Sequence, residues 1–247
     1  MKLYLVRHAQ SANNLIWDGS DRADGRNPDP EITDTGHRQA ELLAEHLAHP
    51  EGEPRQHPFS PGRETSYGLT HVYCSLMTRS VLTAEYIARA CDLDLHALAD
   101  IFEKNGVYEY DGNGVMRGLP GSDRRYFEQR FPGLKLPDGL DSEGWWNRPA
   151  ESHEEFLDRM QAVVAGIKQR HGDSDDCIAM VAHGDFIDQF INELMSVPRH
   201  ENNYDSDWVA NWTFHNTSIS RIDFTRGSHT AVYLNRIEHL PIELITW

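Results

Sequence analysis

Two histidines, two arginines and one glutamate could act together on a phosphate ester: His8, His183, Arg7, Arg79 and Glu103. Two guanidinium groups can neutralise the oxygens of a phosphoryl group and bind them in fork geometry. One imidazole can attack phosphorus while the other donates to an equatorial oxygen. A carboxyl group can protonate the leaving oxygen and then activate water. These residue types therefore predict phosphoryl transfer through a phosphohistidine.

Short apolar segments precede these residues. The runs Leu3–Val6 and Ile178–Ala182 show no alternation with polar residues, which is typical of strands buried on both faces of a parallel sheet. His71–Cys74 predicts a third strand just ahead of the second arginine, and Asp94–Phe102 predicts an extended segment that ends at the glutamate. Because open α/β sheets bind ligands at the carboxyl ends of their strands, we expect these residues to meet at one edge.

Segments with helical periodicity separate the predicted strands. Apolar residues recur at helical spacing in 33–47, behind a Thr or Asp that can cap the helix, and again behind Ser75, which we expect to cap a second helix. A capping-box sequence at 152–155 introduces a third helix, and a fourth follows the second histidine. Ile219–Phe224 and Ala231–Ile237 predict a closing antiparallel hairpin.

Two stretches rich in glycine and proline predict irregular structure. We interpret 49–68 as a surface loop. We expect 104–150 to be a lid or substrate-contacting insertion within a single domain of residues 1–247. The pair Trp145-Trp146 is expected to pack inside this lid. Four cations there are interpreted as solvated, with the alternative that one or two reach the distal end of a substrate: Lys104, Arg117, Arg124 and Arg125.

Composition narrows the class of protein. The formal net charge of -16 argues against sequence-independent binding to nucleic acid or anionic membrane, because either needs a basic face. Three cysteines, far apart and without a CxxC pair, indicate a reducing compartment. No apolar run approaches the ~18 residues of a membrane span and no signal peptide is visible, so we expect a cytoplasmic protein. The expected partner is a small phosphorylated molecule, with no cofactor and no metal; the oligomeric state is not readable.

Five short motifs, in the same order along the chain, resemble those of the histidine phosphatase superfamily, in its phosphoglycerate-mutase-like branch. The first, Arg7-His8-Ala9-Gln10-Ser11-x-x-Asn14, resembles RHGExxxN, with Ala9 and Gln10 in place of the usual Gly and Glu. The second, Ile32-Thr33-x-x-Gly36-x-x-Gln39-Ala40, resembles LTxxGxxQA, and the third, Ser75-x-x-x-Arg79-Ser80-x-x-Thr83-Ala84, resembles SxxxRAxQTA. The fourth, Phe102-Glu103-x-x-Gly106, resembles the segment of the acid/base glutamate, and the fifth, Val181-Ala182-His183-Gly184, resembles VxHG.

The resemblance implies His8 as the nucleophile, with its second ring nitrogen held by a backbone carbonyl, and Glu103 as the proton donor. Glu109 is a second candidate for the acid, and Asn216 is interpreted as an ordinary turn residue. We expect an α/β fold: a three-layer α/β/α sandwich with a mostly parallel sheet, one antiparallel edge region and an inserted lid. The resemblance also implies phosphate binding by the other matching residues: Arg7, Asn14, Arg79, His183 and Gly184.

The activity that we expect is hydrolysis of a phosphomonoester. Since the imidazole of His8 must be neutral and Glu103 must be protonated, we expect a mildly acidic to neutral pH optimum. A phosphoglycerate-type phosphomutase and a non-catalytic phosphate-binding module remain open alternatives. A further alternative is a metal site made of His8, His183, His71 and Asp185. It is disfavoured because these residues match no compact ligand motif and because the two arginines would repel a divalent cation.

Overall fold

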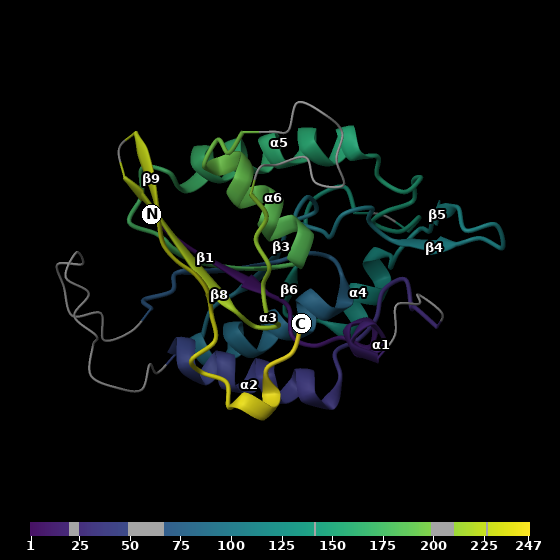
Figure 1. Ribbon diagram of the computed structural model, residues 1–247, viewed down its shortest axis with the longest axis horizontal. Helices are drawn as coiled ribbons and strands as arrows, with labels where there is room; N and C mark the ends of the chain where they lie inside the picture. The colour runs from purple at the N-terminus through teal and green to yellow at the C-terminus, as the bar shows by residue number, and fades with distance from the viewer. Residues whose placement is uncertain (20–24, 49–66, 141, 199–209, 226) are drawn as a thin grey trace.

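The fold is built on one mixed sheet between two layers of helices (Figure 1). The computed structural model describes residues 1–19, 25–48, 67–140, 142–198, 210–225 and 227–247. Within these ranges, seven strands form the sheet in the order β6-β3-β2-β7-β1-β8-β9. Their bounds are β1 Lys2–Arg7, β2 His71–Cys74, β3 Leu95–Ala97, β6 Leu134–Lys135, β7 Cys177–Ala182, β8 Ile219–Thr225 and β9 Ser228–Arg236. The first five strands in this order are parallel, and β8 and β9 pair antiparallel, which confirms the predicted sheet.

The two longest apolar runs of the sequence form the centre of the sheet. β1 and β7 are neighbours, and their internal side chains are fully buried, as the unalternating runs predicted. Arg7 pairs with Ala182 across these strands, and Cys74 of β2 pairs with Val181. The carboxyl ends of β1, β2 and β7 are therefore level, and the residues that follow them emerge at the same edge.

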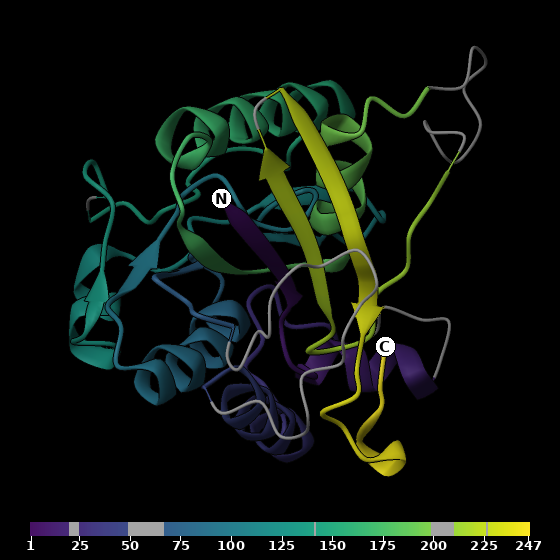
Figure 2. The same cartoon turned by 90° about the vertical axis from the view of Figure 1, so that its left-hand side faces the viewer.

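Helices cover both faces of the sheet, which confirms the three-layer sandwich (Figure 2). On one face lie α2 Asp34–Ala48, α3 Thr78–Cys91 and α4 Arg124–Arg130, whose apolar side chains share one hydrophobic cluster with the sheet. On the other face lie α5 His153–His171 and α6 Gly184–Leu194, within a second cluster. The remaining described helices are α1 Ala12–Gly19 and η1 Ile242–Leu244. Among the described helices, none has the length and apolar character that crossing a membrane requires.

Local capping agrees with the sequence at two helices and differs at one. Thr33 accepts a hydrogen bond from the Gly36 N–H at 3.0 Å, and Ser152 and Glu155 form the reciprocal capping box of α5. The prediction that Ser75 caps α3 is wrong, because α3 begins at Thr78 and its N-cap is Met77, without a side-chain bond. The Ser75 hydroxyl accepts from the Met77 N–H at 3.2 Å and lies 2.8 Å from a ring nitrogen of His183. It belongs to the site described below.

Residues 104–150 have two structural parts. The first contains a separate antiparallel hairpin of β4 Tyr108–Tyr110 and β5 Met116–Gly118, which projects from the body of the molecule (Figure 1). The second contains α4 and β6, and β6 extends the main sheet. Trp146 is buried against Phe102 and sits over Gly106, where a Cβ atom would lie only 2.4 Å from the indole ring. A lid-like closure over the site stays a prediction, and the loop expected at 49–68 falls almost entirely outside the described residues.

A buried ion pair fastens the chain on both sides of residues 104–150 to α5. Arg159 binds Glu151 through Nε at 2.6 Å and Nη2 at 2.7 Å, and its Nη1 donates to the carbonyls of Asp100 and Phe102. The guanidinium carbon also lies 3.6 Å from the ring centre of Phe102. The pair therefore fixes the chain that leads directly into Glu103.

We expect Glu151→Gln to destabilise the protein by about 3–5 kcal/mol, because it leaves the buried guanidinium without its counter-charge. Urea unfolding followed by circular dichroism measures this loss. The matched control is Glu41→Gln, which breaks an exposed pair with Arg38 and should cost about 0–1 kcal/mol. Equal losses in the two variants would contradict the special importance of the buried pair.

Candidate active site

His8 follows β1 and is held as a neutral imidazole. Its Nδ1 lies 2.7 Å from the carbonyl oxygen of Ala9. Because a carbonyl only accepts, Nδ1 carries the proton and Nε2 carries the lone pair. Burial lowers the pKa of His8 well below its usual value, and the charges of Arg79 and Arg7 lower it further. The backbone carbonyl contact that the resemblance implied is therefore present.

His183 lies beside His8, at the start of α6. The two ring centres are 5.2 Å apart, and burial followed by the charge of Arg79 holds the pKa of His183 well below its usual value. Since the Ser75 hydroxyl already accepts from the Met77 N–H, its own proton is available to Nε2 of His183. That arrangement leaves the ring proton on Nδ1, which is buried without a hydrogen-bond partner among the described residues. This N–H is suited to an anionic ligand.

Two guanidinium groups complete the cationic side of the site. Arg79, in the first turn of α3, is buried and donates from Nε to Nε2 of His8 at 3.1 Å. Its Nη1 lies 4.0 Å from a carboxylate oxygen of Asp29, which the backbone and side chain of Thr78 hold at 2.9 and 2.8 Å. Arg7 donates to the backbone carbonyl of Phe214 at 2.5 Å. Both arginines are thus oriented before any ligand binds.

Glu103 lies at the N-terminus of α6, where its carboxyl group accepts from backbone N–H groups. One carboxyl oxygen accepts from the N–H groups of Lys104 at 2.9 Å and Phe186 at 3.1 Å, and the other accepts from Asp185 at 3.3 Å. A Cβ atom at Gly184 would lie 3.9 Å from Glu103 Oε2 and 3.6 Å from Arg7 Nε, so Glu103 is close to the cationic groups.

Burial and, after it, the negative charge of Asp185 raise the pKa of Glu103 to about 7, although the hydrogen bond from Lys104 and the charges of Arg79 and Arg7 lower it. The other candidate acid, Glu109, is exposed on β4 in the projecting hairpin. Of the two candidates, the structure therefore brings Glu103 to the strand ends. A carboxyl group with this pKa exchanges its proton readily near neutral pH.

The loop that follows His8 is held by a buried network that the sequence did not reveal. Asn216 lies in a turn, as expected, but its amide also donates to the carbonyl of His8 at 3.0 Å and to Oδ1 of Asn14 at 3.4 Å. That oxygen of Asn14 accepts from the N–H and hydroxyl of Ser11 as well. On the far side of the loop, Gln39 accepts from the Gln10 N–H at 2.8 Å. Asn14 therefore braces the loop, whatever further contact it makes with a ligand.

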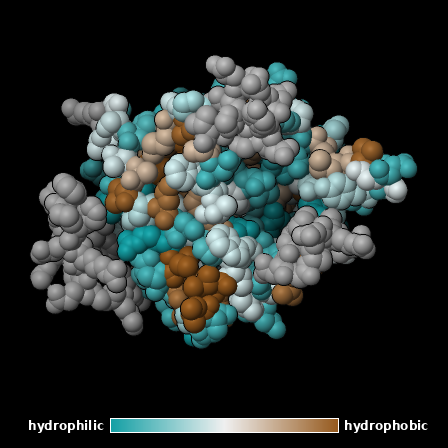
Figure 3. All heavy atoms as spheres, in the orientation of Figure 1, coloured by the Kyte–Doolittle hydropathy of each residue, from teal (hydrophilic) through white to brown (hydrophobic). Residues whose placement is uncertain are grey.

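The hydroxyl of Thr246 joins the two amides of this network. It accepts from Nε2 of Gln39 at 2.8 Å and donates to Oδ1 of Asn216 at 2.9 Å. These bonds fix which end of each amide faces the loop. Thr246 belongs to the C-terminal segment, where Ile242 and Trp247 are exposed. Figure 3 shows an apolar patch over the place of this segment in Figure 1. No sequence signal connects residues about 200 positions apart, so this bracing could not be predicted.

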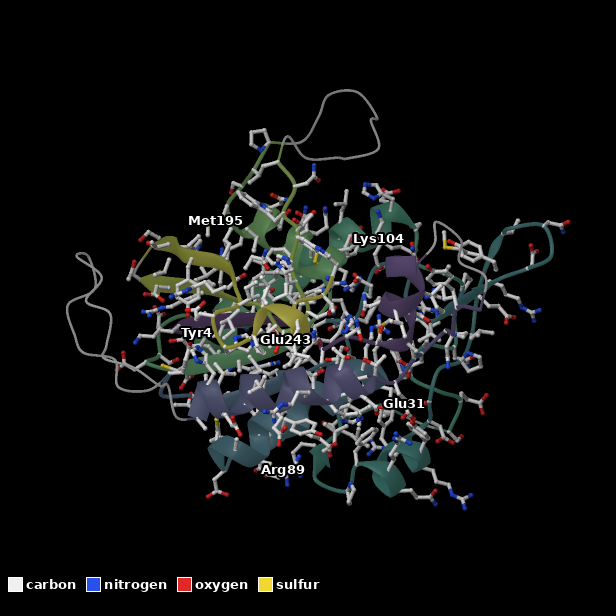
Figure 4. The ribbon with its side chains drawn as sticks, turned by 60° about the horizontal axis from the view of Figure 1, so that its bottom comes forward. Tyr4, Glu31, Arg89, Lys104, Met195 and Glu243 are labelled. Carbon is white, nitrogen blue, oxygen red and sulfur yellow. The ribbon has the colours of Figure 1, made fainter. Side chains whose placement is uncertain are left out.

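The four cations interpreted as solvated, of which one or two could alternatively reach a distal substrate group, have different environments. Lys104, labelled in Figure 4, lies on the side of α5, with Nζ 5.7 Å from the ring centre of Phe156. Arg124 donates to the carbonyls of Leu140 and Pro137, so it stabilises its own segment. Arg117 and Arg125 are exposed.

A cation that the sequence reasoning missed lies nearer to the site. Arg26 donates to the carbonyl of Tyr108 at 2.7 Å and stacks 3.9 Å from the centre of its ring. Burial lowers the pKa of Arg79, and the charge of Arg26 adds to this lowering.

The alternative metal set is not assembled. His8 and His183 lie at the carboxyl ends of β1 and β7, whereas His71 is the first residue of β2 and lies at the opposite edge of the parallel sheet. His71 is thus separated from the two site histidines by the length of the strands.

Comparisons with known proteins agree with this geometry. A family model described as Histidine phosphatase superfamily (branch 1) matches residues 3–61 and 62–237. A curated relative, "Probable phosphoglycerate mutase GpmB" of Yersinia pestis (strain Pestoides F), is 25% identical over 235 residues, which cover 94% of this chain and 88% of that protein.

Solved structures share the fold. Phosphoserine phosphatase from Entamoeba histolytica, in complex with 3-phosphoglyceric acid, has a TM-score of 0.57 at 20% identity, covering 97% of this chain and 99% of the other. The alpha-ribazole phosphatase from Shigella flexneri has a TM-score of 0.57 at 19% identity, covering 96% of each chain.

Proposed function

Because this chain belongs to the histidine phosphatase superfamily, we propose that it hydrolyses a small phosphomonoester through a covalent phosphohistidine on His8. The observation that carries the proposal is the state of that ring, a buried neutral imidazole whose Nε2 accepts a hydrogen bond from Arg79 at 3.1 Å. An unprotonated nitrogen beside a guanidinium can attack a phosphoryl group that the same guanidinium binds.

In the first half-reaction, Nε2 of His8 forms a bond to phosphorus as the bond from phosphorus to the leaving oxygen breaks. Arg79 turns its N–H from Nε2 to a phosphoryl oxygen, and Arg7 and Nδ1–H of His183 bind the remaining oxygens. Glu103, in its protonated form, gives its proton to the leaving oxygen. The Ala9 carbonyl stabilises the positive charge that develops on the His8 ring.

In the second half-reaction, the Glu103 carboxylate takes a proton from a water molecule, whose oxygen attacks phosphorus. The bond between phosphorus and Nε2 breaks, and inorganic phosphate leaves. Glu103 is then protonated again, ready for the next substrate. A carboxyl group with a pKa of about 7 is suited to both directions of this transfer.

The covalent step is tested by trapping. Protein mixed with a ³²P-labelled phosphomonoester and quenched within milliseconds should carry label that is labile in acid and stable in base. Protein without label, together with turnover, would contradict the covalent mechanism; label-free protein that binds phosphate without turnover would indicate a binding module.

A phosphoglycerate mutase is the second candidate, favoured by the name of the curated relatives. A mutase must keep water from the phosphohistidine until a second substrate face is presented. We favour hydrolysis because residues 104–150 are irregular and their hairpin projects outward, and because the solved relatives are named as phosphatases. Assays of phosphate release and of phosphoglycerate isomerisation, run on the same panel of phosphorylated metabolites, separate the two activities.

We expect kcat/KM to be high in mildly acidic solution and to fall as the pH rises above about 7, because Glu103 must be protonated in the first step. The lowered pKa of His8 keeps its nucleophilic nitrogen free throughout this range. Initial rates with p-nitrophenyl phosphate between pH 4.5 and 9.5 measure the profile, with substrate ionisation determined separately. A rate that rises continuously beyond pH 9 would rule out Glu103 as the acid.

We expect Thr246→Val to lower kcat by about 10–100-fold, because the two amides that brace the nucleophile loop lose their common partner and the reacting atoms shift. Thr246→Ser, which keeps the hydroxyl, should retain near-normal kcat. Steady-state kinetics and thermal unfolding of both variants provide the test. A stable Val variant with unchanged kcat would show that the bracing does not matter.

A further inference from the structure

A second cluster of polar side chains lies at the amino-terminal edge of the sheet, away from the phosphate site. It contains His71, the first residue of β2; His171, the last residue of α5; and Asp176, which immediately precedes β7. Each offers one ligand atom, and these atoms all lie within 4.8 Å of one another. We propose that these three residues bind a zinc ion that ties the end of α5 to the starts of β2 and β7.

The donor types fit zinc. Two imidazoles and one carboxylate leave a fourth position for water in a tetrahedral site. His171 Nδ1 lies 2.7 Å from one oxygen of Asp176, and His71 Nδ1 lies 3.9 Å from the other oxygen. The rings of the two histidines are 4.9 Å apart at their centres. Small rotations of the side chains would bring the three atoms to the spacing of zinc ligands.

The groups around the cluster also suit metal binding. The hydroxyl of Tyr73 lies 3.0 Å from Nε2 of His171. A zinc-bound histidine carries its proton on the nitrogen that faces away from the metal, and this N–H needs a hydrogen-bond acceptor. The hydroxyl oxygen of Tyr73 is placed to be that acceptor for His171. Binding through Nδ1 therefore requires His171 to carry its proton on Nε2.

The charges around the cluster are mixed. Asp173 and Asp175 are exposed in the turn that contains Asp176, which favours a cation. The Met1 ammonium donates to the carbonyl of Ser174 at 2.6 Å, and Arg170 lies near Tyr73, so two positive charges oppose it. Direct coordination by three side chains must outweigh this repulsion.

Accessibility is sufficient for metal entry. His171 is buried, whereas the side chains of His71 and Asp176 are 34% and 27% exposed. Because two of the three side chains are partly exposed, an ion can reach the cluster without unfolding of α5. The same exposure means that replacing His71 should leave the fold intact.

The test is titration of the full chain with zinc by isothermal calorimetry, in a buffer without phosphate because inorganic phosphate precipitates zinc. We expect one zinc ion per chain, with thermal stability raised by zinc and restored to its starting value by a chelator. Cobalt titration should give the absorption bands of a tetrahedral site. Absence of stoichiometric binding would overturn the proposal.

Two variants locate the ion. His71→Ala and Asp176→Asn should each abolish the one-to-one binding, whereas His153→Ala, which removes an exposed histidine at the other end of α5, should leave it unchanged. Tyr73→Phe should weaken binding by about 10–100-fold through the loss of the partner of His171. If zinc binds the His71→Ala variant as tightly as the unaltered chain, the ion lies elsewhere and the proposed site is refuted. This outcome does not depend on the results of the phosphatase assays.

Discussion

His8→Ala is expected to lower phosphomonoester hydrolysis by more than about 10⁴-fold, the scale of loss when a hydrolase loses its nucleophile. The small side chain leaves the two arginines and His183 in place, so the site should still bind phosphate. Rate assays at high enzyme concentration measure the residual activity, and ³²P labelling of the protein should disappear with it.

The matched control is His153→Ala, since His153 is exposed at the start of α5. Its rate and labelling should equal those of the unaltered protein. If His8→Ala folds normally and hydrolyses at a rate close to the unaltered chain, the phosphohistidine mechanism fails.

Glu103→Gln is expected to lower kcat by about 10²–10⁴-fold, because the amide keeps the shape of the carboxyl group but cannot donate its proton. The loss should depend on the leaving group. An alkyl phosphate, whose alkoxide is a poor leaving group, should lose more than p-nitrophenyl phosphate, which needs little protonation. Parallel kinetics on the two substrates measure this difference.

Glu109→Gln, on the exposed strand β4, is the control and should change kcat little. Equal losses for the alkyl and aryl phosphates would argue that Glu103 positions other groups without transferring a proton. A large loss of kcat in Glu109→Gln, together with a small loss in Glu103→Gln, would mean that Glu109 is the proton donor and Glu103 is not.

The carboxyl group of Glu103 should also make the stability of the protein depend on pH. Its pKa is raised to about 7 in the folded protein, so folding favours the protonated form. The free energy of unfolding therefore falls as the pH rises from the ordinary pKa of glutamate to about 7, and this loss is complete above pH 7. Glu103→Gln lacks this cost and should be more stable than the unaltered protein at pH 8, with the difference closing below pH 5.

The strand ends could be predicted because the information lies in adjacent residues. An apolar run followed at once by Arg7-His8, or by His183, places a side chain at a known edge of a parallel sheet. The helix caps at Thr33 and Ser152 are equally local. The predicted cap at Ser75 is wrong because the hydroxyl of Ser75 contacts His183, 108 positions away in the sequence. Local patterns predict local geometry well and long-range partners poorly.

The supports of the site illustrate what the sequence could not provide. The bracing by Thr246 and the ion pair that fixes the chain before Glu103 each depend on contacts between segments distant in sequence. The two-residue strand β6 is too short to leave a periodic signal, and its place in the sheet depends on pairing with β3. Such features follow from packing, which a single sequence does not reveal.

The hairpin of β4 and β5 lies outside the main sheet, whereas His8 and His183 follow the central strands of that sheet and Arg79 stands on α3. Exchanging residues 109–117 for a loop of another length and charge should therefore leave the main sheet, and the side chains that it positions, undisturbed.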